Sequence, residues 1–590
     1  MSRMLEDRVQ ERAALRTDST LARRKRRAMV LRRVRFARSL MLLLILSMVV
    51  ALVNLQAFTS PDSYPEAKAA STKTIAVNAV RGSITDRSGV ALAMTVEVRD
   101  VFVDQRLVTD PAGEAAKLAP FLGLERSELQ QKLSGTDGYV MLKRGVSQAD
   151  WNRIADLELP GIGADRSQQR AYPEGSAVAN LLGRLDYSGR ATEGLELQFN
   201  KLLSGVNGTR RYYGSLSIGT DESLTPAQDG SHLMLTIDRD IQTMAQLAIA
   251  EQVKAARAES GSVIVLNSKT GEILAMATAP TYDPANITDK TKQFMGNRVL
   301  SESYEPGSTG KVLTVAALLD SGEASASTRF VVPDSLKRSD GSINDHKNHP
   351  DEKLTLTGIL AKSSNVGMVL AAENMSNEKL FSYFDKFGIG RFSGLKFPNE
   401  TEGRLAPTSE WGGLDRYNKM FGQGYQINLL QAAGVFATVA NDGVRMQPTL
   451  VHGTTDRFGT FTKFTSPAPV RVIKSEAAKQ VREMMESVVS DEGTAPMAQI
   501  PGYRVAGKTG TAQIWNVEKK EWKGYVASFI GFAPADRPEI VVAVQLVKPK
   551  NGHYGGQLAG PVFKKVMKFA LNQMRIATTG KKSPKLQLTW

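Results

Sequence analysis

The segment YEPGSTGKVL (residues 304–313) carries the strongest local signal in this chain of 590 residues. Proline and glycine at positions 306 and 307 interrupt the preceding chain, and the apolar run KVLTVAALLD (residues 311–320) favours a helix. Ser308 is therefore expected at a helix N-terminus, with Lys311 on the same face, about 5–6 Å away between Cβ atoms. At that spacing a lysine amine can reach the serine hydroxyl, and the free N–H groups of the helix end can stabilise an oxyanion. By itself, S-x-x-K also fits a helix cap with a solvated lysine.

Two further patterns follow in order, far along the chain. KSSNVG (residues 362–367) places a hydroxyl and a carboxamide two positions apart, at Ser363 and Asn365, although an ordinary turn has the same composition. KTGTAQIW (residues 508–515) is rich in β-branched residues and predicts a strand in which Gly510 lets another backbone approach closely. The residues there that can bind a carboxylate are Lys508, Thr509 and Thr511.

The set Ser308-x-x-Lys311, Ser363-x-Asn365 and Lys508-Thr509-Gly510 resembles the active site of penicillin-binding proteins and serine β-lactamases. YEPGST, TGEILAMA, SSNVG and VAGKTGTAQ are similar to segments of class B penicillin-binding proteins, the monofunctional transpeptidases. RGSITDR (residues 81–87), AYP (171–173) and LG (182–183) match the pedestal domain of that class. The resemblance covers roughly residues 76–575, and glutamate at position 305 is typical of the septal division type.

The resemblance implies an acyl transfer in which Ser308 forms an ester with a peptidoglycan stem peptide and is blocked by β-lactams. Lys311 is the expected base, although the identity of the acylating base is debated in this superfamily. Ser363 would relay a proton, and the remaining expected residues are Asn365 and Lys508, with Ser364, Thr509, Gly510 and Thr511 for substrate or oxyanion binding. No cofactor and no metal are expected. One departure is Gly310, where many relatives carry a bulky aromatic side chain that forms part of the pocket wall.

An ordinary lysine has a pKa of about 10.4, so Lys311 needs surroundings that disfavour the ammonium form. The positive charge of Lys508 and the helix N-terminus are both expected to act in that direction.

The positive charge of the chain is concentrated near its N-terminus. The net charge is +15, and residues 1–38 hold 13 Lys and Arg against four acidic residues. Residues 39–61 contain no charged residue and are long enough, as a helix, to cross a hydrocarbon core of about 30 Å. This asymmetry predicts a cytoplasmic N-terminus and a catalytic part on the other side of a plasma membrane, and it argues against a nucleic-acid partner. A cleaved signal peptide is the alternative, although Leu55 stands where a small residue is expected.

The predicted fold class is a multidomain α/β chain: one transmembrane helix, an elongated α+β pedestal, and a transpeptidase domain with an antiparallel sheet covered by helices, serine β-lactamase-like by resemblance. Strands are expected at 98–104, 233–238, 261–267, 272–278, 526–533 and 539–547, and helices at 111–122 and 238–256. The expected segments are a basic tail (1–38), a membrane helix (39–60), a linker (61–75), the pedestal (76–228), the transpeptidase domain (229–575) and a C-terminal tail (576–590).

Other motifs fail on their context. Residues 502–509 match a phosphate-binding loop, but no helix start follows the lysine. The histidines at 346 and 349, beside Asp345, predict a surface loop rather than a metal site. The absence of cysteine excludes disulfides, thiolate metal sites and a cysteine nucleophile.

Three functional alternatives stay open: a transpeptidase of side-wall elongation, a D,D-carboxypeptidase or β-lactamase, and a β-lactam sensor. Expected partners are D-Ala-D-Ala stem peptides, a SEDS-family glycosyltransferase and membrane proteins of the divisome, because no glycan-polymerising segment lies between anchor and pedestal.

Overall fold

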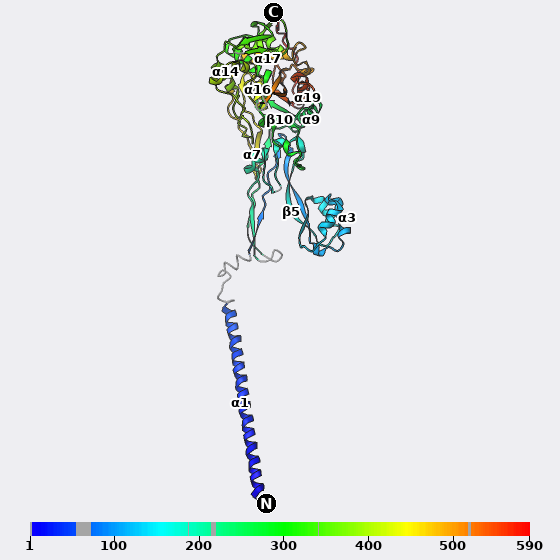
Figure 1. Cartoon of the computed structure of the whole chain (residues 1–590), viewed down its shortest axis with the longest axis vertical. Helices are drawn as coiled ribbons and strands as arrows, with labels where there is room; N and C mark the ends of the chain where they lie inside the picture. The colour runs from blue at the N-terminus through cyan, green and yellow to red at the C-terminus, as the bar shows by residue number, and fades with distance from the viewer. Residues whose placement is uncertain (1–2, 55–71, 187, 214–219, 340, 517–520) are drawn as a thin grey trace. The chain divides into compact units, whose positions relative to one another are not determined.

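The computed structural model describes residues 3–54, 72–186, 188–213, 220–339, 341–516 and 521–590. The chain divides into two compact units, coloured by residue number in Figure 1. One unit comprises Met1–Val77 with Gly208–Pro226, and the other comprises Asn78–Asn207 with Ala227–Trp590. The second unit contains every residue that the sequence assigned to the active site.

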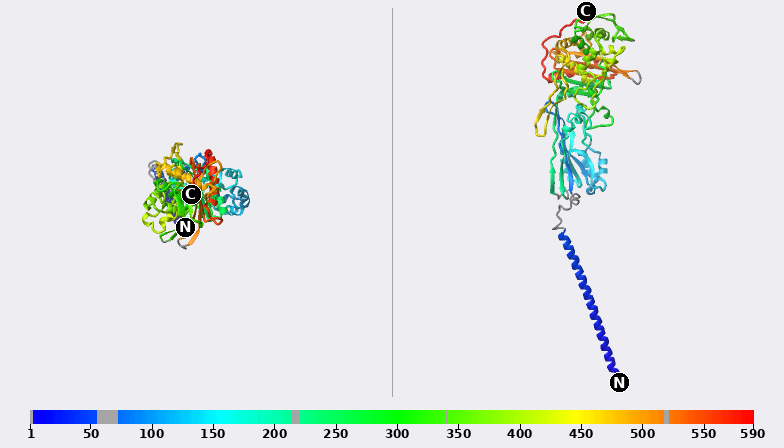
Figure 2. Two further views of the ribbon diagram at one scale, coloured as in Figure 1. Left: turned by 90° about the horizontal axis from the view of Figure 1, so that it is seen from above. Right: turned by 90° about the vertical axis from the view of Figure 1, so that its left-hand side faces the viewer.

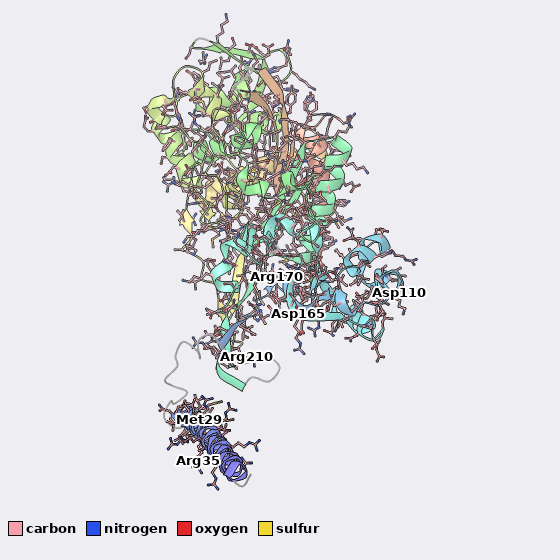
Figure 3. The ribbon with its side chains drawn as sticks, turned by 60° about the horizontal axis from the view of Figure 1, so that its bottom comes forward. Met29, Arg35, Asp110, Asp165, Arg170 and Arg210 are labelled. Atoms are coloured by element: carbon pink, nitrogen blue, oxygen red, sulfur yellow. The ribbon has the colours of Figure 1, made fainter. Side chains whose placement is uncertain are left out.

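The first unit consists of a long helix and a small sheet. Helix α1 (Arg3–Val53) contains, at Arg23–Val53, one apolar stretch long enough to cross a membrane, with a mean hydropathy of 2.4. The side chains of Met29 and Arg35 project from this helix (Figure 3). The last residues of the predicted span, 55–60, lie outside the described residues. Among those described, α1 is the only helix with such a stretch.

The sheet of the first unit is antiparallel, in the order β1-β6-β7. Its strands are β1 (Thr72–Val77), β6 (Gly208–Tyr213) and β7 (Thr220–Thr225). Strand β1 begins inside the segment that the sequence assigned to a linker (61–75), because Thr72–Ile75 pair in register with Tyr213–Arg210. The last residues of the predicted linker therefore form part of a strand.

The pedestal part of the second unit is built on a seven-stranded sheet in the order β17-β16-β8-β2-β3-β4, with β5 also paired to β3. The strands are β2 (Ile84–Thr85), β3 (Ala91–Val103), β4 (Val140–Ser147), β5 (Ile162–Ala171), β8 (His232–Leu235), β16 (Val451–Thr455) and β17 (Phe461–Lys463). Strand β8 pairs with both β2 and β16, so one sheet joins residues from the pedestal and the catalytic part.

Three helices form a separate small core at the end of β3 to β5: α3 (Pro111–Leu122), α4 (Arg126–Leu133) and α5 (Gln148–Ala155). The predicted helix at 111–122 is confirmed, with Asp110 as its N-cap and Gly123 in the left-handed conformation at its C-cap. The sequence missed α4 and α5, each of eight residues, because so short a segment shows little periodicity.

A buried ion-pair group explains why the pedestal motif begins with arginine. Glu196 is fully buried and accepts from two guanidinium groups, Arg81 at 2.6 Å and Arg170 at 2.7 Å. Arg170 lies on β5 (Figure 3). Removing one member of such a buried group leaves an unpaired charge and strongly destabilises a fold.

The catalytic part is built on a five-stranded antiparallel sheet in the order β10-β9-β21-β20-β19. Its strands are β9 (Ser260–Asn267), β10 (Ile273–Ala279), β19 (Ala506–Asn516), β20 (Glu521–Ala533) and β21 (Ile540–Val547). Both predicted hairpins are confirmed, since β9 pairs with β10 and β20 with β21. Helices α9 (Arg239–Ala256) and α19 (Gly560–Gln573) pack together on this sheet, and α16 (Leu429–Ala440) packs on β9, β20 and β21. Almost every residue of β9, β10 and β21 is buried, so both faces of these strands are covered. Cover on both faces explains why β9, β10 and β21 are continuous apolar runs.

Candidate active site

The nucleophile turn lies between a proline and a helix. Residues Gly307–Gly310 form one 3₁₀ turn that leads directly into α11 (Lys311–Ser321), so Ser308 lies one turn before the α-helix. Gly307 has φ of 53°, a left-handed value that favours glycine. Its N–H donates to the carbonyl oxygen of Gly422 at 2.8 Å. A Cβ on Gly422 would lie 1.8 Å from the Gly307 oxygen, so this close backbone pairing requires glycine there.

Lys311 is fully buried, and its contacts define the direction of its lone pair. The Nζ atom lies 3.0 Å from Ser308 Oγ, and it donates to the carbonyl oxygen of Ser363 at 2.6 Å and to Asn365 Oδ1 at 2.7 Å. A neutral amine has two N–H groups and one lone pair. Because the last two partners can only accept, a neutral Lys311 directs its lone pair to the hydroxyl of Ser308.

Burial lowers the pKa of Lys311 to about 7, and the carboxylate of Asp345 partly opposes that change. Burial is thus the cause of the lowered pKa, whereas the sequence had suggested the Lys508 charge and the helix end. A lysine with this pKa is substantially unprotonated at neutral pH and can accept a proton.

The S-x-N pattern lies at the junction of two helices, α12 (Leu356–Lys362) and α13 (Asn365–Ala372). Ser363 ends α12 with φ of 68°, and this left-handed turn directs its carbonyl group to Lys311. The hydroxyl of Ser363 lies 3.4 Å from the Nζ of Lys311 and 2.9 Å from that of Lys508. One hydroxyl therefore bridges the two lysines.

Strand β19 supplies the third pattern. Lys508 is fully buried and donates to the Thr509 carbonyl oxygen at 3.1 Å, in addition to its contact with Ser363. Burial, and then the positive charge of Lys311, hold the pKa of Lys508 well below its ordinary value. An arriving carboxylate would favour the charged form of this lysine. The hydroxyl of Thr511 accepts from the N–H of Gly555 at 3.2 Å.

Two predicted residues have different surroundings from those expected. Ser364 is buried and caps α13 by accepting from the N–H of Gly367, so its hydroxyl already has a structural role at the start of this helix. Gly510 does allow another backbone to approach closely, but that backbone is the nucleophile turn of this same chain. A Cβ there would lie 3.0 Å from the Pro306 carbonyl oxygen, so Gly510 lets β19 pack against the nucleophile turn.

The sequence missed Asp345 as a contributor to the site. Its carboxylate accepts from the N–H groups of Asn365 at 2.5 Å and Val366 at 3.1 Å, and from the hydroxyl of Ser364 at 2.5 Å. His349 Nε2 lies 3.2 Å from the same carboxylate. Asp345 thus anchors the first turn of α13, which carries Asn365. The signal in the sequence is an aspartate beside two histidines, a pattern that suggests a metal ligand before it suggests a helix anchor. Among the residues described, no group of three acidic or histidine side chains is arranged to hold a metal.

A second supporting group lies beneath the nucleophile turn. Glu305 accepts from the N–H of Gly424 at 3.0 Å, and burial raises the pKa of this glutamate. Lys419 is fully buried, forms an ion pair with Asp415 and lies 5.0 Å from the centre of the Trp411 ring. These contacts hold the segment that pairs with the nucleophile turn through Gly422.

Two family models match the chain: the penicillin binding protein transpeptidase domain at residues 261–568, and the penicillin-binding protein dimerisation domain at residues 76–235. The chain belongs to the class B penicillin-binding proteins. This confirms the predicted family and the predicted fold class, a pedestal followed by a transpeptidase domain.

Named relatives of this penicillin-binding protein include D,D-transpeptidases. It is 34% identical to the penicillin-binding protein PbpB of Mycolicibacterium smegmatis, over 86% of this chain and 85% of the relative. It is 33% identical to the peptidoglycan D,D-transpeptidase FtsI of Escherichia coli, over 86% of each chain. Among solved structures, penicillin-binding protein 3 of Mycobacterium tuberculosis in complex with ampicillin is 29% identical, with a TM-score of 0.71, covering 88% of this chain and 100% of that one.

Proposed function

We propose that this penicillin-binding protein is a peptidoglycan D,D-transpeptidase that works through an acyl-enzyme on Ser308 and is inhibited by β-lactams. One observation carries the proposal: the buried amine of Lys311, with a pKa of about 7, has both N–H groups engaged and lies 3.0 Å from the Ser308 hydroxyl. The relatives named D,D-transpeptidases, and the ampicillin complex of a relative, support the same reaction class.

In the first half-reaction, Lys311 takes the proton of Ser308 while Oγ attacks the carbonyl carbon between the last two D-alanines of a stem peptide. The developing oxyanion is held by the N–H groups of Ser308 and Thr511. The C–N bond then breaks, and the departing amine receives a proton through the hydroxyl of Ser363, which contacts both lysines. Lys508, with Thr509 and Thr511, binds the terminal carboxylate.

In the second half-reaction, the amine of a neighbouring stem peptide attacks the ester carbon. The amine gives up a proton to Lys311, the C–O bond breaks, and Ser308 recovers its hydroxyl proton. The product is a peptide cross-link, and the ester bond is consumed without any external energy source. A β-lactam enters the same first step, but its opened ring stays attached and blocks the acceptor.

Acylation by a fluorescent penicillin, followed by mass mapping of the labelled peptide, tests this proposal. We expect the label on Ser308, no label in Ser308→Ala, and unchanged labelling in Ser303→Ala, a neighbouring exposed serine. A label on another residue, or wild-type labelling of Ser308→Ala, contradicts it. Incubation with a stem peptide and an acceptor amine then separates transpeptidation from hydrolysis, because only the former yields a cross-linked product.

We further propose that the protein is a single-pass membrane protein with residues 1–38 in the cytoplasm and its catalytic part outside. The charge step along α1 supports this orientation. Protease added to intact protoplasts should remove the catalytic part and spare the N-terminal tail. Digestion of the N-terminal tail alone would indicate the opposite orientation. The limits 76–228 and 229–575 for pedestal and transpeptidase domain belong to the same proposal, supported by the family matches at 76–235 and 261–568.

The proposed site of action is the division septum, with a SEDS-family glycan polymerase and other divisome membrane proteins as partners. The name FtsI among the relatives supports the septal role, as does Glu305 before the nucleophile. Depletion should block septation, giving filaments in a rod or chains in a polar grower. Cells that become round while dividing normally would assign the protein to side-wall elongation instead.

A further inference from the structure

Residues 576–590, which lie beyond the matched transpeptidase domain, attach to the catalytic part at two separate places. At the first place, the N–H of Thr579 donates to the carbonyl oxygen of Gly502 at 2.8 Å. The hydroxyl of Tyr503 donates to the carbonyl oxygen of Ile576 at 2.7 Å. The hydroxyl of Thr579 also donates to Asp536 at 3.1 Å. This first anchor therefore binds Gly502 and Tyr503, in the segment that leads into strand β19.

The second anchor adds a short strand to a small sheet. Strands β11 (Arg329–Val332) and β14 (Glu352–Thr355) pair with each other, and Thr589 pairs with Leu354 on the other edge of β14. The N–H of Thr355 donates to the Leu588 carbonyl oxygen at 3.0 Å. The backbone of residues 587–590 thus completes hydrogen bonds that the edge of β14 would otherwise leave open.

The second anchor is closely fitted. A Cβ on Gly358 would lie 2.0 Å from the carbonyl oxygen of Leu588, so only glycine allows the tail to lie against the first turn of α12. The ring of Trp590 receives two cations, with Arg329 and Lys353 each 5.2 Å from its centre. A loosely attached tail would require neither feature.

Both anchors lead directly to active-site residues. Thr355 is the N-cap of α12: its hydroxyl accepts from the N–H of Gly358 and donates to the carbonyl oxygen of Gln587 at 2.6 Å. Helix α12 has seven residues, a length of about 10 Å, and its buried body ends at Ser363. The first anchor holds Gly502, six positions before Lys508. Figure 2 shows the C-terminal end of the chain, in red, running along the outside of the catalytic part.

We propose that residues 576–590 are a positioning segment for the reaction, a strap that holds α12 and β19 so that Ser363 bridges Lys311 and Lys508. The inference rests on the proposed function. A helix that shifts by 1 Å at Thr355 carries Ser363 with it, because α12 is short and rigid. The contact between Ser363 and Lys508 joins residues 145 positions apart, and no local turn holds it in place.

The test compares two proteins in detergent: the full-length chain, and a variant that ends after Lys585 and therefore lacks only the second anchor. Rate constants for acylation by a fluorescent penicillin are measured per titrated active site, from pH 5 to pH 9. We expect a rate about 10- to 100-fold below wild type, as for a catalytic group misplaced by about 1 Å. The half-point of the pH profile should also move, since Lys311 donates to the Ser363 carbonyl. Lys582→Ala, in the exposed stretch between the anchors, is the matched control and should react as wild type.

A truncated chain that reacts at the wild-type rate with the same pH half-point overturns the inference. So does a lower number of active sites with an unchanged rate per site, because that outcome describes stability alone. If the truncated chain does not fold, Thr355→Val and Thr355→Ser decide: serine, which keeps the hydroxyl, should restore the rate that valine loses. A wild-type chain without acylation at Ser308 would instead reject the proposed function.

Discussion

The pH dependence of acylation tests the proposed role of Lys311 most directly. With a pKa of about 7, its neutral fraction rises from about 1% at pH 5 to about 50% at pH 7, so a rate that depends on the neutral amine should rise about 50-fold. The sign follows from the role: a base must be unprotonated, so the rate falls as the pH decreases through the pKa. A lysine with an ordinary pKa would still be almost fully protonated at pH 7.

The assay is stopped-flow acylation by a fluorescent penicillin at limiting enzyme, corrected at each pH for the number of titratable active sites. That correction separates loss of the base from loss of the fold. Circular dichroism at pH 5 should match that at pH 7. A rate that is flat from pH 5 to pH 7, or that begins to rise only above pH 9, would refute a neutral Lys311 as the base.

A single substitution sharpens this test. The carboxylate of Asp345 raises the pKa of Lys311, so Asp345→Asn should move the half-point of the profile to lower pH while keeping a similar shape at the N-terminus of α13. Ser364→Ala is the matched control, because it removes a hydrogen bond to Asp345 without removing the charge. A half-point that moves upward in Asp345→Asn would contradict the electrostatic reasoning.

Three further predictions concern the surroundings of the nucleophile turn. Lys508→Ala should slow penicillin acylation about 30-fold, the loss of a charged hydrogen bond, and therefore less than removal of the proposed base. Gly310→Ala should lower the free energy of unfolding in urea by about 2 kcal/mol, since its Cβ would lie 2.5 Å from the Tyr425 hydroxyl oxygen. Adding Tyr425→Phe should recover only part of this loss of stability, because backbone atoms also crowd the site. Asp415→Ala should lower the free energy of unfolding by about 3 kcal/mol, because it leaves the buried Lys419 without the carboxylate that pairs with it. A decrease below about 1 kcal/mol would count against a stabilising role for that ion pair.

Local patterns were sufficient for much of the fold. The spacing of Ser308 and Lys311 places both side chains on one face of a helical turn, about 5–6 Å apart between Cβ atoms, which is close enough for the observed contact of 3.0 Å between Nζ and Oγ. The hairpin of β9 and β10 followed from two apolar runs joined by a short turn, and the helix at 111–122 from its cap residues. Each of these depends on residues close together in the chain.

Contacts between distant segments did not follow from the sequence. Ser363 and Lys508 meet only because β19 and α12 pack around α17 (Ser475–Val489). The anchoring of α13 by Asp345 depends on a loop that returns to the helix start from about 20 positions away. Neither propensity nor periodicity describes such a return, because both are properties of a single segment.

The sequence by itself determined the reactive groups and their order: a serine hydroxyl, two lysine amines and a carboxamide on a helix start, a helix junction and a strand. The tertiary structure decided their protonation and direction. Lys311 is an ordinary lysine in composition, and its pKa of about 7 arises because packing removes the amine from water. The same packing places the Ser363 carbonyl and the Asn365 amide oxygen on its two N–H groups, so its lone pair is left for Ser308.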